Sequence, residues 1–221
     1  ARLLHDLRYC LRVNHKAVSR ASGPDRNEQF EYIARQRVSF TERALPVVSI
    51  DGKKREMIGN FKNAGSTWTK APERVNDHDF LSDAHGVALP YGIYDVCANL
   101  GTVFVGTSHD TPQSAAENLA RWWETEGRDR YPGATELLVL ADGGGSNGAR
   151  TRAFKHTIQN RLCDRHRISV TFCHYPSGTS KWNPIEHRLF SEISKNWKGV
   201  PLKDYETMLN YIRTTKTKRG L

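Results

Sequence analysis

Residues 137–145 read Leu137-Leu138-Val139-Leu140-Ala141-Asp142-Gly143-Gly144-Gly145. An unbroken apolar run that stops at a glycine-rich turn is typical of a buried β-strand. This strand ends on a carboxylate, Asp142, and a second apolar run over residues 45–50 ends in the same way on Asp51. Two aspartates at the ends of strands can meet at one edge of a sheet, so the stretch predicts both a sheet and an acidic site.

A third acidic residue, Glu186, follows Ile185 at the start of an apolar stripe with helical spacing, which continues through Leu189 and Ile193. Pro184 suits the first turn of that helix, and Asn183 is expected to cap it. Each acid alone has an ordinary explanation, because strand-end aspartates form turns and a first-turn glutamate favours the helix dipole.

Three converging carboxylates repel one another unless cations lie between them. Carboxylate oxygens suit hard divalent ions, and paired ions suit in-line phosphoryl transfer. Asp51, Asp142 and Glu186 are therefore the candidate catalytic and metal-binding residues of an enzyme that cuts or joins nucleic-acid strands.

The glycine-rich turn offers a competing interpretation, because Gly143, Gly145 and Gly148 match the dinucleotide-binding pattern G-x-G-x-x-G. Asp142 would place a carboxylate beside the bound pyrophosphate, and the next strand ends at His174 without an acid for the ribose. We therefore expect the glycines to leave room beside Asp142 for a metal ion and a phosphate.

The composition fits a polyanionic partner. The 221 residues contain 33 Lys and Arg against 24 Asp and Glu, a net charge of +9. Several polar residues near the three acids are candidate contacts to nucleic acid, and the alternative is an ordinary polar loop: Lys53, Lys54, Ser146, Asn147, Thr179, Ser180 and Lys181.

Other classes of protein fit less well. No apolar run reaches transmembrane length, and the first thirty residues lack the core of a signal peptide. The four cysteines are scattered without a C-x-x-C pair, which disfavours a zinc site. Cys97 and Cys173 lie in strand-like runs and are expected to be buried free thiols, which fits a cytoplasmic, nucleoid-associated protein without a membrane partner.

The order of elements predicts a mixed α/β sheet with helices on its faces. Strands are expected over residues 45–51, 91–96, 102–107, 137–141 and 168–173, and helices over 25–43, from 112, 149–163, from 185 and 203–213. A loop is expected over 127–133. Residues 59–90 are polar, with little periodicity, and are expected to form an irregular insertion that Trp68 and Phe80 anchor to the core.

The N-terminal part, residues 1–44, is expected to be a helical segment separate from a catalytic domain over 45–221. Residues 2–11 carry a helical stripe of leucines followed by basic residues. Two interpretations stay open: the tail of a truncated helix-turn-helix DNA-binding domain, and a terminal helix that covers the core. The absence of an initial methionine predicts a fragment or a processed chain.

Several longer blocks resemble the DDE transposases of bacterial insertion sequences, in the group known as the Rhodopirellula-type transposases. The blocks are Ser49-Ile50-Asp51-Gly52-Lys53-Lys54, Gly59-Asn60-Phe61-Lys62-Asn63-Ala64-Gly65, Pro90-Tyr91-Gly92-Ile93-Tyr94-Asp95, Ala141-Asp142-Gly143-Gly144-Gly145-Ser146-Asn147-Gly148 and Gly178-Thr179-Ser180-Lys181-Trp182-Asn183-Pro184-Ile185-Glu186-His187-Arg188-Leu189-Phe190.

The resemblance implies a ribonuclease H-like core with a mixed five-stranded sheet, and it assigns the family's three acidic positions to Asp51, Asp142 and Glu186. It further implies two bound Mg²⁺ or Mn²⁺ ions, and Asp51 would bind both of them. The expected partners are DNA at the ends of the element and DNA at the target. A homo-oligomer on DNA is a candidate assembly. Three alternatives remain: a nuclease of the same fold that only hydrolyses, a catalytically silent DNA-binding protein, and a dinucleotide-dependent oxidoreductase.

Overall fold

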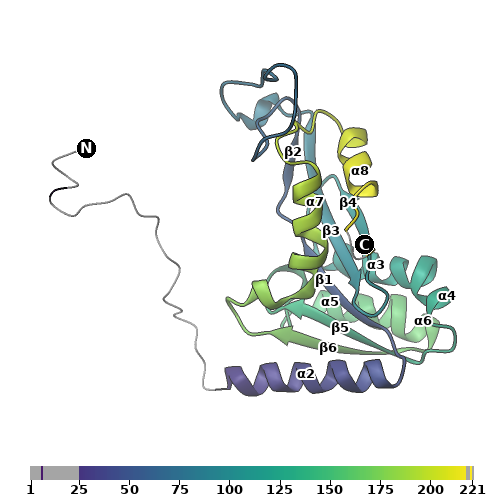
Figure 1. Cartoon of the computed structure of the whole chain (residues 1–221). Helices are drawn as coiled ribbons and strands as arrows, with labels where there is room; N and C mark the ends of the chain where they lie inside the picture. The colour runs from purple at the N-terminus through teal and green to yellow at the C-terminus, as the bar shows by residue number, and fades with distance from the viewer. Residues whose placement is uncertain (1–5, 7–24, 218–219, 221) are drawn as a thin grey trace.

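The structure, a computed structural model, describes residue 6, residues 25–217 and residue 220 (Figure 1). The predicted leucine stripe over residues 2–11 and part of the basic tail, at residues 218–219, lie outside the described residues. The predicted helix over 25–43 is present as α2 (Arg26–Glu42).

A mixed six-stranded sheet forms the centre of the fold. Its strands are β1 (Val47–Gly52), β2 (Glu56–Ile58), β3 (Gly86–Asp95), β4 (Leu100–Gly106), β5 (Glu136–Asp142) and β6 (Ser169–Tyr175). The order is β2-β3-β1-β5-β6, and β4 also pairs with β3. β1 is antiparallel to β3 and parallel to β5, and β5 is parallel to β6. This confirms the predicted ribonuclease H-like mixed sheet, to which the structure adds the short strand β2.

Most of the described helices cover the two faces of this sheet. The longer ones are α3 (Pro112–Trp122), α5 (Arg152–Ile158), α7 (Ser191–Asn196) and α8 (Tyr205–Arg213). Three π-helical segments extend them: η2 (Trp123–Gly127), η4 (Gln159–Cys163) and η6 (Glu186–Phe190). Short segments are α4 (Arg128–Arg130), α6 (Asp164–His166), η1 (Leu81–Asp83), η3 (Gly145–Asn147) and η5 (Ser180–Trp182). The loop expected over 127–133 therefore begins only after α4.

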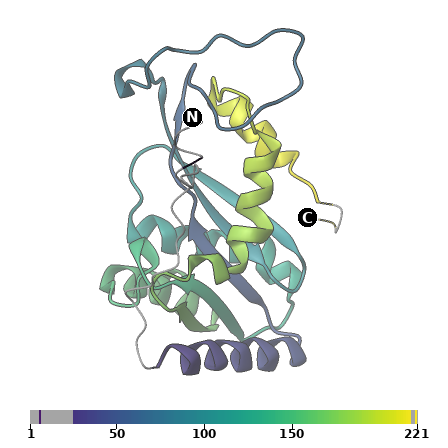
Figure 2. The ribbon, with the colours of Figure 1, turned by 60° about the vertical axis from the view of Figure 1, so that its left-hand side comes forward.

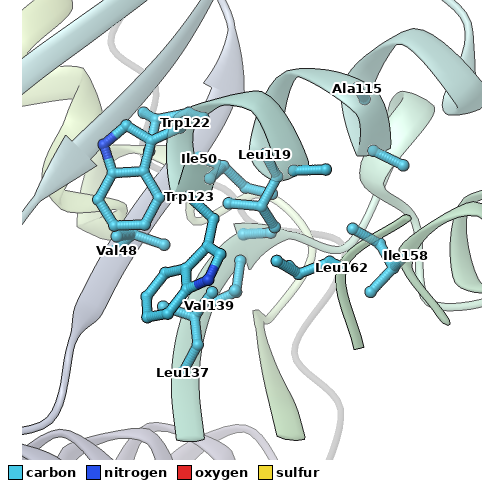
Figure 3. Close-up of a cluster of buried hydrophobic side chains, with 14 of the residues drawn as sticks. Val48, Ile50, Ala115, Leu119, Trp122, Trp123, Leu137, Val139, Ile158 and Leu162 are labelled. Carbon is cyan, nitrogen blue, oxygen red and sulfur yellow. The ribbon is translucent and has the colours of Figure 1, made fainter. Parts of the chain in front are cut away.

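One face of the sheet packs against α3 and α5. Val48 of β1 lies beside Trp122, and Leu137 and Val139 of β5 lie beside Trp123, in a cluster whose side chains are almost completely buried (Figure 3). The alternation of a strand sends every second residue to the opposite face. The residues between these, Val47, Ser49 and Asp51 on β1 and Leu138, Leu140 and Asp142 on β5, therefore belong to the other face.

That other face has two covers. α2 lies along β1, β5 and β6 and buries Ile33 and Phe40 against them. η6, α7 and α8 pack on β2, β3 and β4 through a cluster that includes Ile185, Ile193 and Met208. α2 lies at the side of the sheet formed by β5 and β6, whereas α7 lies over β3 (Figures 1 and 2). The chain between β6 and α7 therefore crosses close to the ends of β1 and β5.

The irregular insertion differs from the prediction at its boundary and in its anchors. Residues 86–90 belong to β3, so the irregular part ends at residue 85. Trp68 is fully exposed and Phe80 is 59% exposed, so the prediction that they anchor the insertion is wrong. Phe61 is buried, and the Asn63 amide donates to the carbonyls of Trp197 and Val200, both at 3.2 Å. These contacts hold the start of the insertion, because the Asn63 side chain reaches two carbonyl groups in the turn after α7.

Cys173 is buried as predicted, but Cys97 is exposed because it lies in the turn after β3 instead of within the strand. In the part of the chain that the structure describes, no helix has the length and apolar character to cross a membrane.

Candidate active site

Two of the three predicted acids lie side by side at the ends of parallel strands. Ile50 of β1 is in register with Ala141 of β5, so Asp51 and Asp142 are the next residues along the two neighbouring strands. By the alternation of the strands, both side chains fall on the face that η6 and α7 cover. Both residues are partly buried.

Glu186 reaches the same place from the helix that packs on this face. It is the first residue of η6, and the side chains that follow it, Leu189 and Phe190, are buried against the sheet. Gly92 of β3 makes the close packing feasible, because a Cβ there would lie 2.6 Å from Phe190 and 2.8 Å from Ile185. The helix that carries Glu186 therefore rests directly on the strand beside β1.

The charges of the three acids act on one another. Burial raises the pKa of Asp51 to about 7, with further upward contributions from the negative charges of Asp142 and Glu186. The pKa of Glu186 is raised by burial and then by Asp142, against a smaller lowering by Lys53. The pKa of Asp142 is also raised by burial, while a hydrogen bond from the Asn183 side chain opposes the rise. The structure thus brings the three predicted acids into one electrostatic site.

The donor set fits hard divalent cations. Oδ1 of Asp142 is buried without a hydrogen-bond partner, which leaves a carboxylate oxygen free for an ion. Among the described residues, no three acidic, histidine or cysteine side chains are arranged to enclose a single ion. The carboxylates would therefore act in pairs, and this suits Mg²⁺, which proteins commonly bind through one or two carboxylates with water and phosphate as the other ligands.

The structure adds a fourth acid that the sequence analysis missed. Asp110, in the loop between β4 and α3, raises the pKa of Asp51 slightly, and its Oδ2 lies 3.9 Å from the position of a Cβ on Gly52. It follows a short strand and an exposed polar segment, so no apolar pattern marked it.

The glycine-rich turn after β5 is held by its last polar residue. The Tyr91 hydroxyl donates to Asn147 Oδ1 at 2.8 Å, and His174 Nε2 lies 2.8 Å from the Asn147 carbonyl oxygen. Gly144 and Gly145 have open space where a side chain would be, and Gly145 has a φ of +67°. α5 begins only at Arg152, so the turn does not open a helix as a dinucleotide site requires.

The candidate nucleic-acid contacts divide into two groups. Lys53, Asn147 and Thr179 have partners inside the protein. Lys53 Nζ lies 2.5 Å from Glu56 and 4.7 Å from the centre of the Trp197 ring, and the Thr179 hydroxyl donates to the Pro176 carbonyl. The members of the second group reach the surface: Lys54, Ser146, Ser180 and Lys181.

A basic groove of about 530 Å³ has Lys53, Lys54, Arg55 and Lys62 in its lining, together with two acids, Glu56 and Asp79. Lys54, Arg55 and Lys62 line it, and no acidic side chain pairs with them among the described residues. Trp197 and Lys53 lie in its wall, and Lys53 is also close enough to Glu186 to lower its pKa. Sequence analysis missed the groove because Trp197, in its wall, lies far from Lys54 along the chain.

Comparison with known proteins gives a consistent result. The family described as "Rhodopirellula transposase DDE domain" matches residues 1–221. No curated protein matches the sequence. Among solved structures, similarity extends to "Mos1 transposase paired-end complex with left transposon end", with 14% identity, coverage of 96% of this chain and 60% of that one, and a TM-score of 0.63.

Two further Mos1 structures are similar. "Crystal structure of the Mos1 Strand Transfer Complex" has 13% identity, coverage of 96% and 59%, and a TM-score of 0.62. "Crystal structure of the mariner Mos1 paired end complex with Mg" has 14% identity, coverage of 95% and 60%, and a TM-score of 0.57. The chain thus spans about 60% of the length of these Mos1 chains. At this level of identity the likeness establishes the fold.

Proposed function

Because the chain belongs to the Rhodopirellula transposase DDE domain family, we propose that it cuts DNA strands at the ends of an insertion sequence and joins them to a target. The observation that carries this proposal is the convergence of Asp51, Asp142 and Glu186 from two strands and a helix, where burial raises the pKa of each and the charge of Asp142 raises the pKa of the other two further. Three acids so close together are unfavourable in a purely structural role, since each increases the cost of ionising another.

The three carboxylates would hold two Mg²⁺ or Mn²⁺ ions. As the family resemblance implies, Asp51 would contribute to both ions, and Asp142 and Glu186 would each contribute to one. Bound ions would supply activation of water or of a DNA 3′-hydroxyl and stabilise charge on the reacting phosphate. The protein's own part is to hold the free oxygen of Asp142 towards the site and to fix Glu186 on a packed helix.

The basic groove supports a path for the DNA backbone. Lys54, Arg55 and Lys62 line it without acidic partners, and Lys53 connects its wall to Glu186. Positive side chains that neutralise phosphates gain affinity through the release of counterions. We place the phosphate backbone of one DNA strand in this groove, with Ser180 and Lys181 as further exposed contacts beside Glu186.

The proposed division of the chain follows from the packing. Residues 45–217 contain the sheet and the acids, and α2 buries Ile33 and Phe40 against that sheet, so α2 packs as a part of the catalytic unit. A DNA-reading role for the N-terminal segment would then fall on residues before α2. The similar Mos1 structures are described as paired-end complexes, which supports a homo-oligomer on DNA as the working assembly.

A two-stage DNA assay tests the function. The chain is incubated with supercoiled plasmid and a labelled duplex that carries a free 3′-hydroxyl, with Mg²⁺, Mn²⁺ or EDTA. We expect metal-dependent nicking and transfer of the label to the plasmid, both lost in Asp51→Asn. Nicking without transfer would favour the hydrolytic nuclease. DNA binding with no metal-dependent product, together with no binding of Mn²⁺, would favour the silent DNA-binding protein.

A further inference from the structure

The segment that carries Glu186 is tied to β1 by a buried pair of polar side chains. Ser49 lies within an otherwise apolar strand and is completely buried, as is Asn183. The Ser49 hydroxyl donates to Asn183 Oδ1 at 2.5 Å and accepts from the Ile185 backbone N–H at 3.1 Å. The expected role of Asn183 as a side-chain cap is wrong, because its side chain turns towards the sheet.

Asn183 contacts the chain at all three acidic residues. Its Nδ2 donates to the carbonyl oxygen of Ile50, the residue before Asp51, at 3.3 Å. Its backbone oxygen accepts from the N–H of Glu186 at 3.1 Å. Its side chain also hydrogen bonds to the Asp142 carboxylate.

We propose that Asn183, fixed by Ser49, is a positioning residue that sets the spacing of the three carboxylates and orients Asp142 for metal binding. The inference rests on the function proposed above. The Asn183 side chain favours the charged form of the Asp142 carboxylate, and Oδ1 of Asp142 is buried without a hydrogen-bond partner, which leaves that oxygen for the ion. Hydrogen-bond partners of this kind fix the orientation of a ligating side chain before the metal binds, so the side chain loses less conformational freedom on binding.

A purely structural role makes a different prediction, and paired replacement separates the two. Removing one member of a buried hydrogen-bonded pair leaves the other without a partner and destabilises the fold. Replacing both with apolar side chains of similar shape can be nearly neutral. Asn183 has extended backbone angles before Pro184, which leucine also adopts. Ser49→Ala combined with Asn183→Leu should therefore restore part of the stability, because the Ile185 N–H and the Ile50 carbonyl still lack their side-chain partners, and it should not restore the contact to Asp142.

The experiment compares thermal melts without metal and Mn²⁺ titration calorimetry without DNA. Wild type, Ser49→Ala, Asn183→Leu and the double variant are measured. Asp204→Ala serves as a control that loses the cap of α8, a hydrogen bond from Thr207 N–H at 2.6 Å, far from the acids in the fold. We expect each single change to lower the melting temperature by roughly 3–10 °C. We expect the double variant to recover part of that loss.

The Mn²⁺ affinity decides the proposal. We expect Asn183→Leu and the double variant to bind Mn²⁺ about 10- to 100-fold more weakly than wild type, the effect typical of outer-shell partners. Asp204→Ala should keep the wild-type affinity. Wild-type affinity in the double variant would overturn the proposal. The proposal would also be overturned if Asn183→Leu and Asp204→Ala both lost Mn²⁺ affinity in proportion to their loss of melting temperature.

Two further arms separate this proposal from the function on which it rests. If wild type binds no Mn²⁺, or if Glu186→Gln binds as wild type does, the metal site itself is wrong. If the Glu186 variant loses affinity and the Asn183 variants do not, only the positioning role fails.

Discussion

At the scale of single residues, Asp51 carries the clearest sign of function. Burial and three neighbouring acids raise its pKa to about 7, although the Gly52 N–H, which donates to it at 2.8 Å, favours the charged form. Ionisation of Asp51 is therefore unfavourable in the free protein, and cations bound at the ends of the two strands would make it favourable. The same repulsion makes the site sensitive to a loss of charge and to pH.

Glu186→Gln should abolish metal-dependent cleavage and joining while the fold stays intact. Glutamine keeps the size of the side chain but lacks the negative charge that a divalent ion needs. The metal-free variant should melt at the same temperature as wild type or slightly higher, because a partly buried acid is costly without ions. A thermal melt and a cleavage assay with Mg²⁺ check this. Undiminished cleavage with the same melt would remove Glu186 from the site.

The metal-free protein should lose stability as pH rises from 5 to 8. The pKa of Asp51 is about 7 in the folded state against an ordinary value of 3.8. The folded state therefore keeps a proton that the unfolded chain releases, so the stabilisation is complete below about pH 4 and is lost as pH rises through about 7. The raised pKa values of Asp142 and Glu186 act in the same direction.

Melting curves against pH, with and without Mg²⁺, check this prediction. The difference between wild type and Asp51→Asn should change by on the order of 3 kcal/mol over this range. Added Mg²⁺ should raise the wild-type melting temperature most at pH 8. Equal pH slopes in the two proteins would contradict the assignment.

Sequence reasoning identified the acids but not their supports. The apolar runs that end in Asp51 and Asp142 can be recognised in the sequence, because the spacing of apolar residues and the residues that end a strand are local features. The bond between Ser49 and Asn183 joins residues 134 positions apart. Thr179 looked like a phosphate contact, and only the folded loop shows its hydroxyl donating to Pro176.

At the scale of elements, the helix that carries Glu186 is the least ordinary part. A four-residue apolar spacing predicted a helix, but η6 is a π-helical segment, a form often found at functional sites. The spacing of apolar residues does not distinguish a π-helical segment from an α-helix, and η2 and η4 are π-helical as well. The strands were easier to predict, because Leu137–Ala141 is apolar on both faces as a central parallel strand requires.

Gly92→Ala should weaken both the fold and the activity. The new methyl group would meet Phe190 and Ile185 at under 3 Å, so the helix must move away from β3. Overpacking of this kind costs about 1–3 kcal/mol, and the movement would carry Glu186 from the other acids. Thermal melts and Mg²⁺-dependent cleavage measure the two effects.

Gly106→Ala is the matched control on the same sheet. A Cβ there lies 3.6 Å from the Leu89 carbonyl oxygen, an ordinary contact. The free energy of unfolding of this variant should stay within about 1 kcal/mol of the wild-type value, and its cleavage activity should be unchanged. Equal losses in the two variants would show that the packing of η6 on Gly92 has no special role.

At the scale of the whole molecule, the fold gathers three basic side chains around one groove. The net charge of +9 predicted a polyanionic partner, but only the folded chain shows Lys54, Arg55 and Lys62 around one groove. Trp68 is a case in which the sequence misled: its apolar ring predicted burial, but the loop leaves it exposed to solvent. Global charge could be read from the sequence, whereas its distribution depends on tertiary contacts.

Replacing Lys54, Arg55 and Lys62 together with alanine should weaken DNA binding and reduce its dependence on salt. If each contacts a phosphate, the slope of log affinity against log salt should shrink by roughly 2 to 3. Fluorescence anisotropy with a labelled duplex at several salt concentrations measures this. Alanine at Arg152, Lys155 and Arg161, on α5 and η4, removes the same charge elsewhere. Equal losses in the two triple variants would argue against the groove.

The most direct test of the account counts the Mn²⁺ ions that one chain binds. Titration calorimetry at pH 8, without DNA, should give two ions for wild type and for Asp129→Asn, which changes an exposed acid on α4. Asp51→Asn should bind neither ion with measurable affinity, because both depend on the shared carboxylate. Undiminished binding of two ions by Asp51→Asn would contradict the claim that Asp51, Asp142 and Glu186 form one two-metal site.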